Sequence, residues 1–493
     1  MDCGVSCGAR VVVSSVAVNL KDCPPFASVS STNLPAAEQA ALDKFLADAT
    51  AAATNGDFAA TAKSLDQAST LDPTSAILRY HCAEAFSKAQ NLAAAKSQFQ
   101  AACDDDALPF RTDSKLNGLT AEVARRRSAS QKDRLVYFDA VEFFERLSKG
   151  EAPGSSWFYE HVHFNFDGNY QLALGWANAL DPWLAANATP AQASTWPSQE
   201  SCERRLGLTD WNRVGVLDDV VLRFGRAPFT GQEGHSNRVA ECQALIGRLR
   251  KRMDTNAIHQ ARALYTEAVG RDETDALLHE NFAEFLEGAG DPDSAVTQWQ
   301  RVAALLPHHH LGFYHTGRLL SERRKFGEAR PWLAKSITLR PDLEDGWVEL
   351  GKLDYAEAKY ELSIEDLEKA RALLPQDYRI YYQKGRALSK LARGAEAIEN
   401  YRKVIQLRPG YWQAQYSLGE EMAFAGQNQE AMEQFREVIR QRPQHALSHL
   451  NLGVALYKAG RRTEAHQQFE EVLRLDPQNK MAADYLKHID GSK

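Results

Sequence analysis

The sequence predicts a mainly α-helical protein whose C-terminal part is an α-solenoid of stacked helix pairs. One pattern of 34 residues is repeated six times between Ala276 and Asn479 without insertion or deletion, and we call this segment the array. Self-similarity at a fixed period of this length is typical of stacked repeats and not of a single globular core. The period is marked by Pro307, Pro341, Pro375, Pro409, Pro443 and Pro477, and by Gly317, Gly351, Gly385, Gly419 and Gly453.

Each unit of the array is predicted to be helix, turn, helix. In the last unit Leu447, Leu450 and Val454 recur at helical intervals, Gly460 interrupts the pattern, and a second helical run extends to Pro477. Apolar residues at this spacing predict amphipathic helices, and glycine and proline mark their ends.

Small residues recur where the two helices of a unit are expected to come closest. In the last unit these are Gly453 and Ala465, and Phe469 is expected to fill the space beside them, because a larger side chain would push the helices apart. The small position of the second helix recurs as Ala295, Ala329, Ser363, Ala397, Ala431 and Ala465. The large position four residues later recurs as Trp299, Leu333, Leu367, Tyr401, Phe435 and Phe469.

The array resembles the tetratricopeptide repeat (TPR) family. The resemblance implies a right-handed superhelix of antiparallel helix pairs, with a concave groove lined by the first helices. It also implies a protein–protein interaction scaffold whose partner is a protein or peptide segment. Residues 480–493 are predicted to contain a capping helix from Lys480 to Ile489, since an array must end on a polar outer face.

Two positions of each first helix are predicted to face the groove. When the units are numbered from Ala276, His310, Glu344, Tyr378, Trp412 and Ala446, positions five and nine lie four residues apart on one helical face. These positions provide Arg318, Lys352 and Arg386, which we call the cation stripe, and Tyr314, Tyr382 and Tyr416. The stripe suits an acidic or carboxylate-ended peptide in extended form. Equally, the tyrosines could pack between units while the cations pair with glutamates.

Composition narrows the possible partners. The 493 residues carry a net charge of −7, with 44% hydrophobic and 25% charged residues. With no basic tract, this balance argues against nucleic-acid binding. No apolar run approaches the roughly 20 residues of a membrane span. The seven cysteines include no CxxC pair, and Cys3, Cys7 and Cys23 lack histidines at zinc-site spacing, so no metal and no cofactor are predicted.

Residues 1–185 are predicted to hold a partial α/β region. Val11 to Val18 and Arg134 to Asp139 are apolar, β-branched or aromatic runs typical of buried strands. Between them, within residues 38–109, the segments Leu42–Ser75 and Ala76–Pro109 repeat the 34-residue period in weaker form. This predicts two TPR-like helical hairpins inserted between the strands.

A polar, aromatic loop follows the second strand. Its order of Glu160, His163, Asn165, Gly168 and Tyr170 resembles the last motif block of SGNH (GDSL-type) hydrolases. The resemblance implies that His163 is a general base oriented by Glu160, with His161 as the fallback base, inside a flavodoxin-like domain. Such a base needs one ring nitrogen toward a serine and the other toward a carboxylate.

The serine block of that family has no counterpart in this sequence, and neither does its Gly-x-Asn block. The resemblance therefore implies an esterase or acyl transferase that lacks its nucleophile and is inactive as written, with the sequence beginning inside the domain. Two other interpretations stay open for this loop. The histidines could be structural, or His161 and His163 could be two ligands of a metal.

The remaining segment connects these parts. Residues 186–237 are rich in Pro, Ser, Thr and Gly and are predicted to be a linker with one helix that begins near Thr209. Residues 238–275 are predicted to form a degenerate repeat that retains Ala261, Tyr265 and Ala268.

Overall fold

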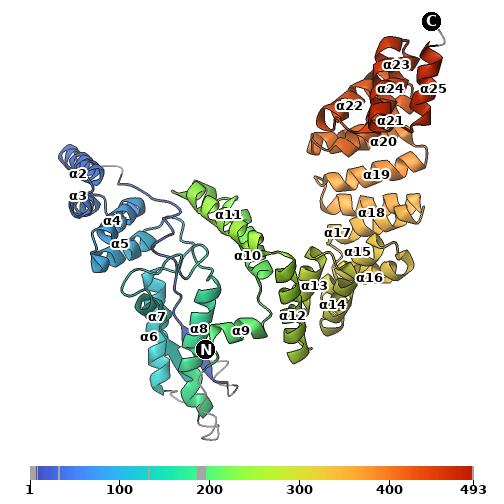
Figure 1. The fold of residues 1–493 in the computed structure, drawn as a ribbon. Helices are drawn as coiled ribbons and strands as arrows, with labels where there is room; N and C mark the ends of the chain where they lie inside the picture. The colour runs from blue at the N-terminus through green and yellow to red at the C-terminus, as the bar shows by residue number, and fades with distance from the viewer. Residues whose placement is uncertain (1–6, 8, 32–33, 131–133, 186–195, 491–493) are drawn as a thin grey trace. The chain divides into compact units, whose positions relative to one another are not determined.

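A computed structural model describes residues 7, 9–31, 34–130, 134–185 and 196–490. The chain divides into two compact bodies, an N-terminal body of Met1–Arg271 and a C-terminal body of Asp272–Lys493. Both are built mainly of helices (Figure 1). Cys3 and residues 186–195 of the predicted linker lie outside the described residues.

The two predicted strands of the N-terminal body pair in parallel. β1 (Val11–Ser14) runs beside β2 (Leu135–Phe138), with Val11 opposite Leu135. β1 is shorter than predicted because the Asn117 side chain binds the backbone of Val16. The Val16 amide donates to Asn117 Oδ1 at 2.9 Å, and Asn117 Nδ2 donates to the Val16 carbonyl oxygen at 3.0 Å. Among the described residues the sheet has these two strands and no more, so the flavodoxin-like sheet that we predicted is absent from this part of the chain.

The other elements of this part of the N-terminal body are helices. The inserted hairpins are α2 (Ala36–Thr54) with α3 (Phe58–Leu71), and α4 (Ala76–Lys88) with α5 (Leu92–Asp104), each helix packing on the next. α6 (Ser114–Ser130) and α8 (Phe166–Ala185) contact both strands, and α7 (Ala140–Leu147) contacts α8.

The segment after residue 195 is more helical than the predicted linker. It contains α9 (Gln199–Arg205), α10 (Asp210–Phe224), the 3₁₀ turn η2 (Phe229–Gly231), α11 (His235–Arg252) and α12 (Thr255–Arg271). Residues 196–237, where the sequence predicted one helix, contain α9, α10 and the first residues of α11. In the segment predicted as a degenerate repeat, α11 packs on α10 through buried apolar faces, and α12, which buries Ala261, Tyr265 and Ala268, packs on α9.

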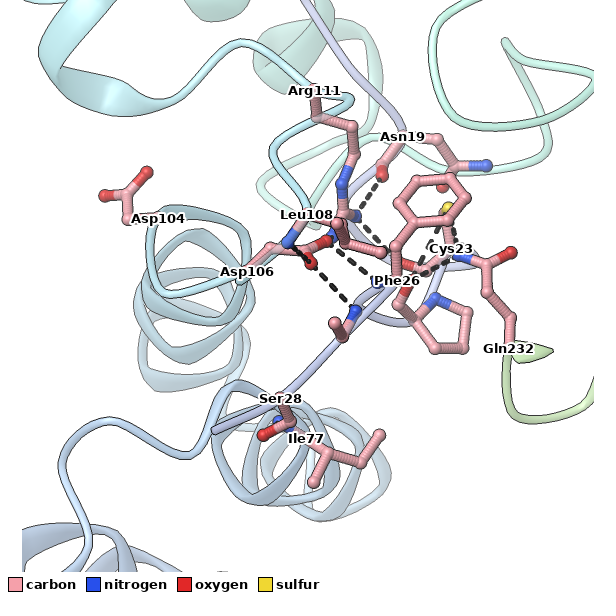
Figure 2. Close-up of polar contacts among 12 residues, drawn as sticks. Asn19, Cys23, Phe26, Ser28, Ile77, Asp104, Asp106, Leu108, Arg111 and Gln232 are labelled. Atoms are coloured by element: carbon pink, nitrogen blue, oxygen red, sulfur yellow. Dashed lines mark hydrogen bonds and ion pairs between the residues drawn. The ribbon is translucent and has the colours of Figure 1, made fainter. Parts of the chain in front are cut away.

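A buried ion pair holds distant parts of the N-terminal body together (Figure 2). Arg111 Nη2 lies 3.2 Å from Asp106 Oδ2, and both side chains are 2% exposed. Arg111 Nη1 also donates to the carbonyl oxygens of Asn19 at 3.0 Å and Cys23 at 2.7 Å. Asp106 in turn accepts the Phe26 amide at 2.9 Å. The pair therefore fixes the chain that follows β1 against the end of the inserted hairpins.

The C-terminal body stacks its helices in chain order (Figure 1). The first helices of the six units are α13 (Ala276–Gly288), α15 (His310–Glu322), α17 (Glu344–Ala356), α19 (Tyr378–Lys390), α21 (Trp412–Phe424) and α23 (Ala446–Lys458). The second helices are α14 (Pro292–Leu305), α16 (Phe326–Leu339), α18 (Tyr360–Leu373), α20 (Gly394–Leu407), α22 (Asn428–Gln441) and α24 (Arg462–Leu475).

The predicted close approach of the two helices is confirmed. A Cβ atom built on Gly453 would lie 2.7 Å from Cε1 of Phe469, and one on Gly419 would lie 2.7 Å from Cε1 of Phe435. Such distances are far shorter than a carbon–carbon contact allows, so glycine is needed at these positions. Ala465 and Phe469 are both fully buried.

Successive units pack in the order that a solenoid requires. Each second helix contacts the next first helix, and α24 contacts the capping helix α25 (Lys480–Asp490), which buries Ala482 and Ile489. First helices also contact the first helix of the next unit, at α15 with α17, α17 with α19, and α21 with α23. Within the described residues, none of the helices combines the length and the apolar composition that a membrane crossing requires.

Candidate functional site

The first cation of the stripe is neutralised within the array. Arg318, on α15, contacts the carboxylate of Glu287 through Nη2, and its Nη1 donates to Glu322 at 2.9 Å. Burial raises the pKa of Glu287, but hydrogen bonds from His315 and Arg318 outweigh burial and lower that pKa to about 2. Arg318 is therefore part of an internal ion-pair network.

The second cation has an internal partner as well. Lys352, on α17, places Nζ 2.7 Å from Oε1 of Glu349, three residues earlier on the same helix. The Glu349 side chain is 10% exposed, so its charge needs this ammonium group. Lys352 therefore forms an ion pair within its own helix.

The third cation, Arg386 on α19, differs from the other two. Its guanidinium carbon lies 4.2 Å from the ring centroid of Tyr355 and 5.9 Å from that of Tyr382, and its Nη1 donates to the Gln383 side chain at 2.9 Å. In the part of the chain that the structure describes, no carboxylate oxygen lies within 4.0 Å of its nitrogens. Arg386 is therefore held by aromatic rings, and its charge is not neutralised by any acidic side chain among the described residues.

The predicted tyrosines pack between neighbouring units. Tyr382 lies edge-on to Tyr411, with ring centroids 5.1 Å apart, and Tyr416 lies edge-on to His445 at 5.1 Å. The Tyr416 hydroxyl accepts a hydrogen bond from Asn451 in the next unit at 3.1 Å. Burial raises the pKa of Tyr314. Of these three tyrosines, Tyr382 also contacts a cation of the stripe, because the Arg386 guanidinium carbon lies 5.9 Å from its ring centroid.

Position twelve of the units contributes groups that we did not predict from the sequence. Glu287 neutralises Arg318 of the following unit, and Tyr355 supports Arg386 of the following unit. Both pairs join position twelve of one first helix to position nine of the next. The residue type at position twelve varies from unit to unit, so the 34-residue period alone does not mark this position.

The N-terminal body brings Glu160 and His163 together as the sequence predicted. The Glu160 carboxylate is buried and contacts Nδ1 of His161 and Nδ1 of His163. Burial raises the pKa of Glu160, but the hydrogen bonds and charges of His161 and His163 outweigh it and lower that pKa to about 2. The His163 side chain is 56% exposed, whereas His161 lies edge-on to Phe26 and Phe229.

A tight loop explains this geometry. Phe158 and Phe164 form an isolated antiparallel bridge, and the Tyr159 amide donates to the His163 carbonyl oxygen at 2.9 Å. The Phe158 and Phe164 rings stack with centroids 4.5 Å apart. The turn between them therefore presents Glu160 and His163 on one side.

The environment of His163 provides no nucleophile in the described residues. Apart from Glu160, the polar side chain that contacts its ring is Arg223, with Nη1 3.3 Å from Nδ1 and 3.5 Å from Nε2. Arg223 also lines a cavity of about 220 Å³ beside His163. Sequence reasoning missed Arg223, which lies 60 positions away on α10. No group of three or more His, Cys, Asp or Glu side chains within the described ranges is placed to hold a metal ion.

Two protein-family models match segments of the C-terminal body. One model of the tetratricopeptide repeat matches residues 281–344 and 416–480, and a second matches residues 378–411. The array is built of tetratricopeptide repeats. Repeats of this kind typically bind proteins or peptides on their stacked helices. No curated protein matches this sequence.

Several solved structures are similar to part of the chain. A TPR protein described as having an unusual peptide-binding site, YrrB, is 21% identical, with 38% of this chain and 97% of that one covered and a TM-score of 0.35. MamA from Desulfovibrio magneticus is 23% identical, with 34% and 96% covered and a TM-score of 0.33. PilF of Pseudomonas aeruginosa is 15% identical, with 45% and 100% covered and a TM-score of 0.39.

Proposed function

We propose that the tetratricopeptide array is an interaction scaffold that binds an extended peptide or protein segment in its groove, with Arg386 as the anchor for a carboxylate. One observation carries this proposal. Of the three cations in the stripe, Arg318 and Lys352 are neutralised by glutamates, whereas Arg386 has no acidic partner among the described residues.

The surroundings of Arg386 suit this role. The Tyr355 and Tyr382 rings restrict the guanidinium through cation–π contacts, so less side-chain entropy is lost when a ligand binds. Guanidinium and carboxylate groups form charge-assisted, often bidentate hydrogen bonds that contribute roughly 1.5–3 kcal/mol each. A peptide carboxylate at Arg386 would therefore supply the strongest single contact in the groove.

Matched substitutions test this role. Fluorescein-labelled ten-residue peptides with glutamate or glutamine at each position identify an acidic ligand and its affinity for the whole chain. Arg386→Gln is expected to weaken binding of that ligand about 10- to 100-fold, because one charge-assisted contact is lost. Arg318→Gln is the control and is expected to change the affinity less than about threefold. An equal loss in both variants, or no loss in Arg386→Gln, would show that Arg386 is not the anchor.

One observation favours a second candidate function. The buried Glu160 orients the exposed His163 through Nδ1, which is the arrangement of an acid and a general base in serine hydrolysis. On this candidate, the chain supplies the acid–base half of an SGNH-type esterase or acyl transferase whose nucleophile lies outside it.

The second candidate predicts that the 493-residue chain alone does not turn over esters. Hydrolysis of p-nitrophenyl acetate by the purified chain is expected to equal that of His163→Ala, because no hydroxyl group contacts His163 in the described residues. Turnover that His163→Ala abolishes would contradict the view that the nucleophile is missing.

A further inference from the structure

The groove changes its chemistry after Arg386. Position nine is Arg386 in the fourth unit, Glu420 in the fifth and Val454 in the sixth. Glu420 has no cationic partner in the described residues, and the Asn451 amide group donates to its Oε1 at 3.4 Å. Because no cation lies beside the Glu420 carboxylate in the described residues, it would repel a second acidic residue of a ligand one unit beyond Arg386.

A large apolar side chain is exposed beside Glu420. Phe424 lies one helical turn beyond it on the same face of α21 and is 89% exposed. The large position of the same unit is filled by Phe435, which is fully buried, so Phe424 does not serve that core. The Phe424 ring offers an apolar surface that a ligand side chain can cover.

We propose that the array selects an extended peptide in which an acidic residue binds Arg386 and a large apolar residue binds Phe424 one unit further along. This inference rests on the proposed function and specifies the ligand. Packed helices lie about 8–10 Å apart and an extended chain covers about 3.3–3.6 Å per residue, so the two ligand residues are separated by about three positions. Charge complementarity fixes the register, because Arg386 attracts the acid and Glu420 repels it.

An extended segment suits this spacing better than an amphipathic helix. The groove presents the cation Arg386 on α19, and the carboxylate of Glu420 and the ring of Phe424 on α21, which is the first helix of the next unit. An extended peptide places one residue near each helix at this distance. In an α-helix with a rise of about 1.5 Å per residue, two residues that far apart would be about six positions apart.

Synthetic peptides test the inference on the whole chain. In one neutral ten-residue background, the central segment is Glu-Ala-Ala-Phe, Phe-Ala-Ala-Glu, Glu-Ala-Ala-Ala or Glu-Ala-Ala-Glu, and fluorescence anisotropy gives each affinity. One of the two orders with phenylalanine is expected to bind about tenfold more tightly than Glu-Ala-Ala-Ala, and Glu-Ala-Ala-Glu is expected to bind no more tightly than Glu-Ala-Ala-Ala. Tightest binding by Glu-Ala-Ala-Glu would overturn the inference.

Protein variants separate this inference from the function on which it rests. Phe424→Ala is expected to remove the tenfold gain without affecting Glu-Ala-Ala-Ala, and circular dichroism checks that it is folded. Leu362→Ala is the control, since Leu362 is 48% exposed on a second helix, α18. If Arg386→Gln weakens binding but Phe424→Ala does not, the apolar site is wrong and the proposed function stands. If neither variant weakens binding, both are wrong.

Discussion

Replacing Phe435 by alanine is expected to lower the local free energy of unfolding of the array by about 3–5 kcal/mol. The Phe435 side chain is fully buried, and its ring lies against Gly419 with no room for a Cβ atom between them. Its removal leaves a cavity where the two helices of the fifth unit meet, in addition to the lost burial of apolar surface. Hydrogen exchange of peptides from α21 and α22 measures the change in the intact chain.

Phe424→Ala is the matched control for this measurement. It makes the same chemical change in the same unit, but the Phe424 ring is 89% exposed, so the expected change is within about 0.5 kcal/mol. Because units contact mainly their neighbours, the loss of protection in Phe435→Ala is expected to be largest in the fifth unit and the units next to it. Equal protection in both variants would show that Phe435 is not a packing centre.

Replacing Arg111 by methionine is expected to destabilise the N-terminal body by about 3–5 kcal/mol. The substitution leaves Asp106 as a buried carboxylate without its cation, and the carbonyl oxygens of Asn19 and Cys23 lose their donor (Figure 2). Such groups lose their hydration on folding and depend on internal partners. Urea unfolding of the whole chain, followed by hydrogen exchange of segment 19–27, measures this loss.

The control for Arg111 is Arg146→Met. Arg146 pairs with Glu142 at 2.8 Å, but both side chains are more than 60% exposed, at 64% and 62%. Exposed pairs contribute about 0–1 kcal/mol, so little change is expected. A destabilisation by Arg111→Met no larger than that by Arg146→Met would contradict the structural role assigned to the buried pair.

The array could be predicted in detail because the same close contact between a small residue and a large residue recurs in each unit. Gly419 and Phe435 stand 16 positions apart, and the same small and large residues recur at that spacing in other units. The residues that contact each other within a unit are therefore close together in the sequence, and the repeat makes them recognisable. Contacts between units were harder to predict from the sequence, since the pairing of Glu287 with Arg318 depends on how one first helix lies on the next.

The N-terminal body could be predicted only where its contacts are local. Glu160 and His163 are three residues apart, and a tight loop suffices to bring them together. Arg223 comes from a helix 60 positions away, and Arg111 bonds residues 88 and 92 positions away. No periodicity marks such pairs. β1 was predicted too long for the same reason. The Val16 amide donates to the side chain of Asn117, which lies 101 positions away in the sequence.

A charge-reversal cycle tests the central claim, that Arg386 binds a ligand carboxylate in the groove, most directly. The affinities of the native chain and Arg386→Glu are measured by isothermal titration calorimetry with the preferred acidic peptide and with its Glu→Lys form. We expect Arg386→Glu to lose the acidic peptide and to bind the lysine peptide more tightly than the native chain does, with a coupling of at least tenfold. Independent effects of the two charge reversals, with no coupling, would contradict direct contact between Arg386 and the ligand.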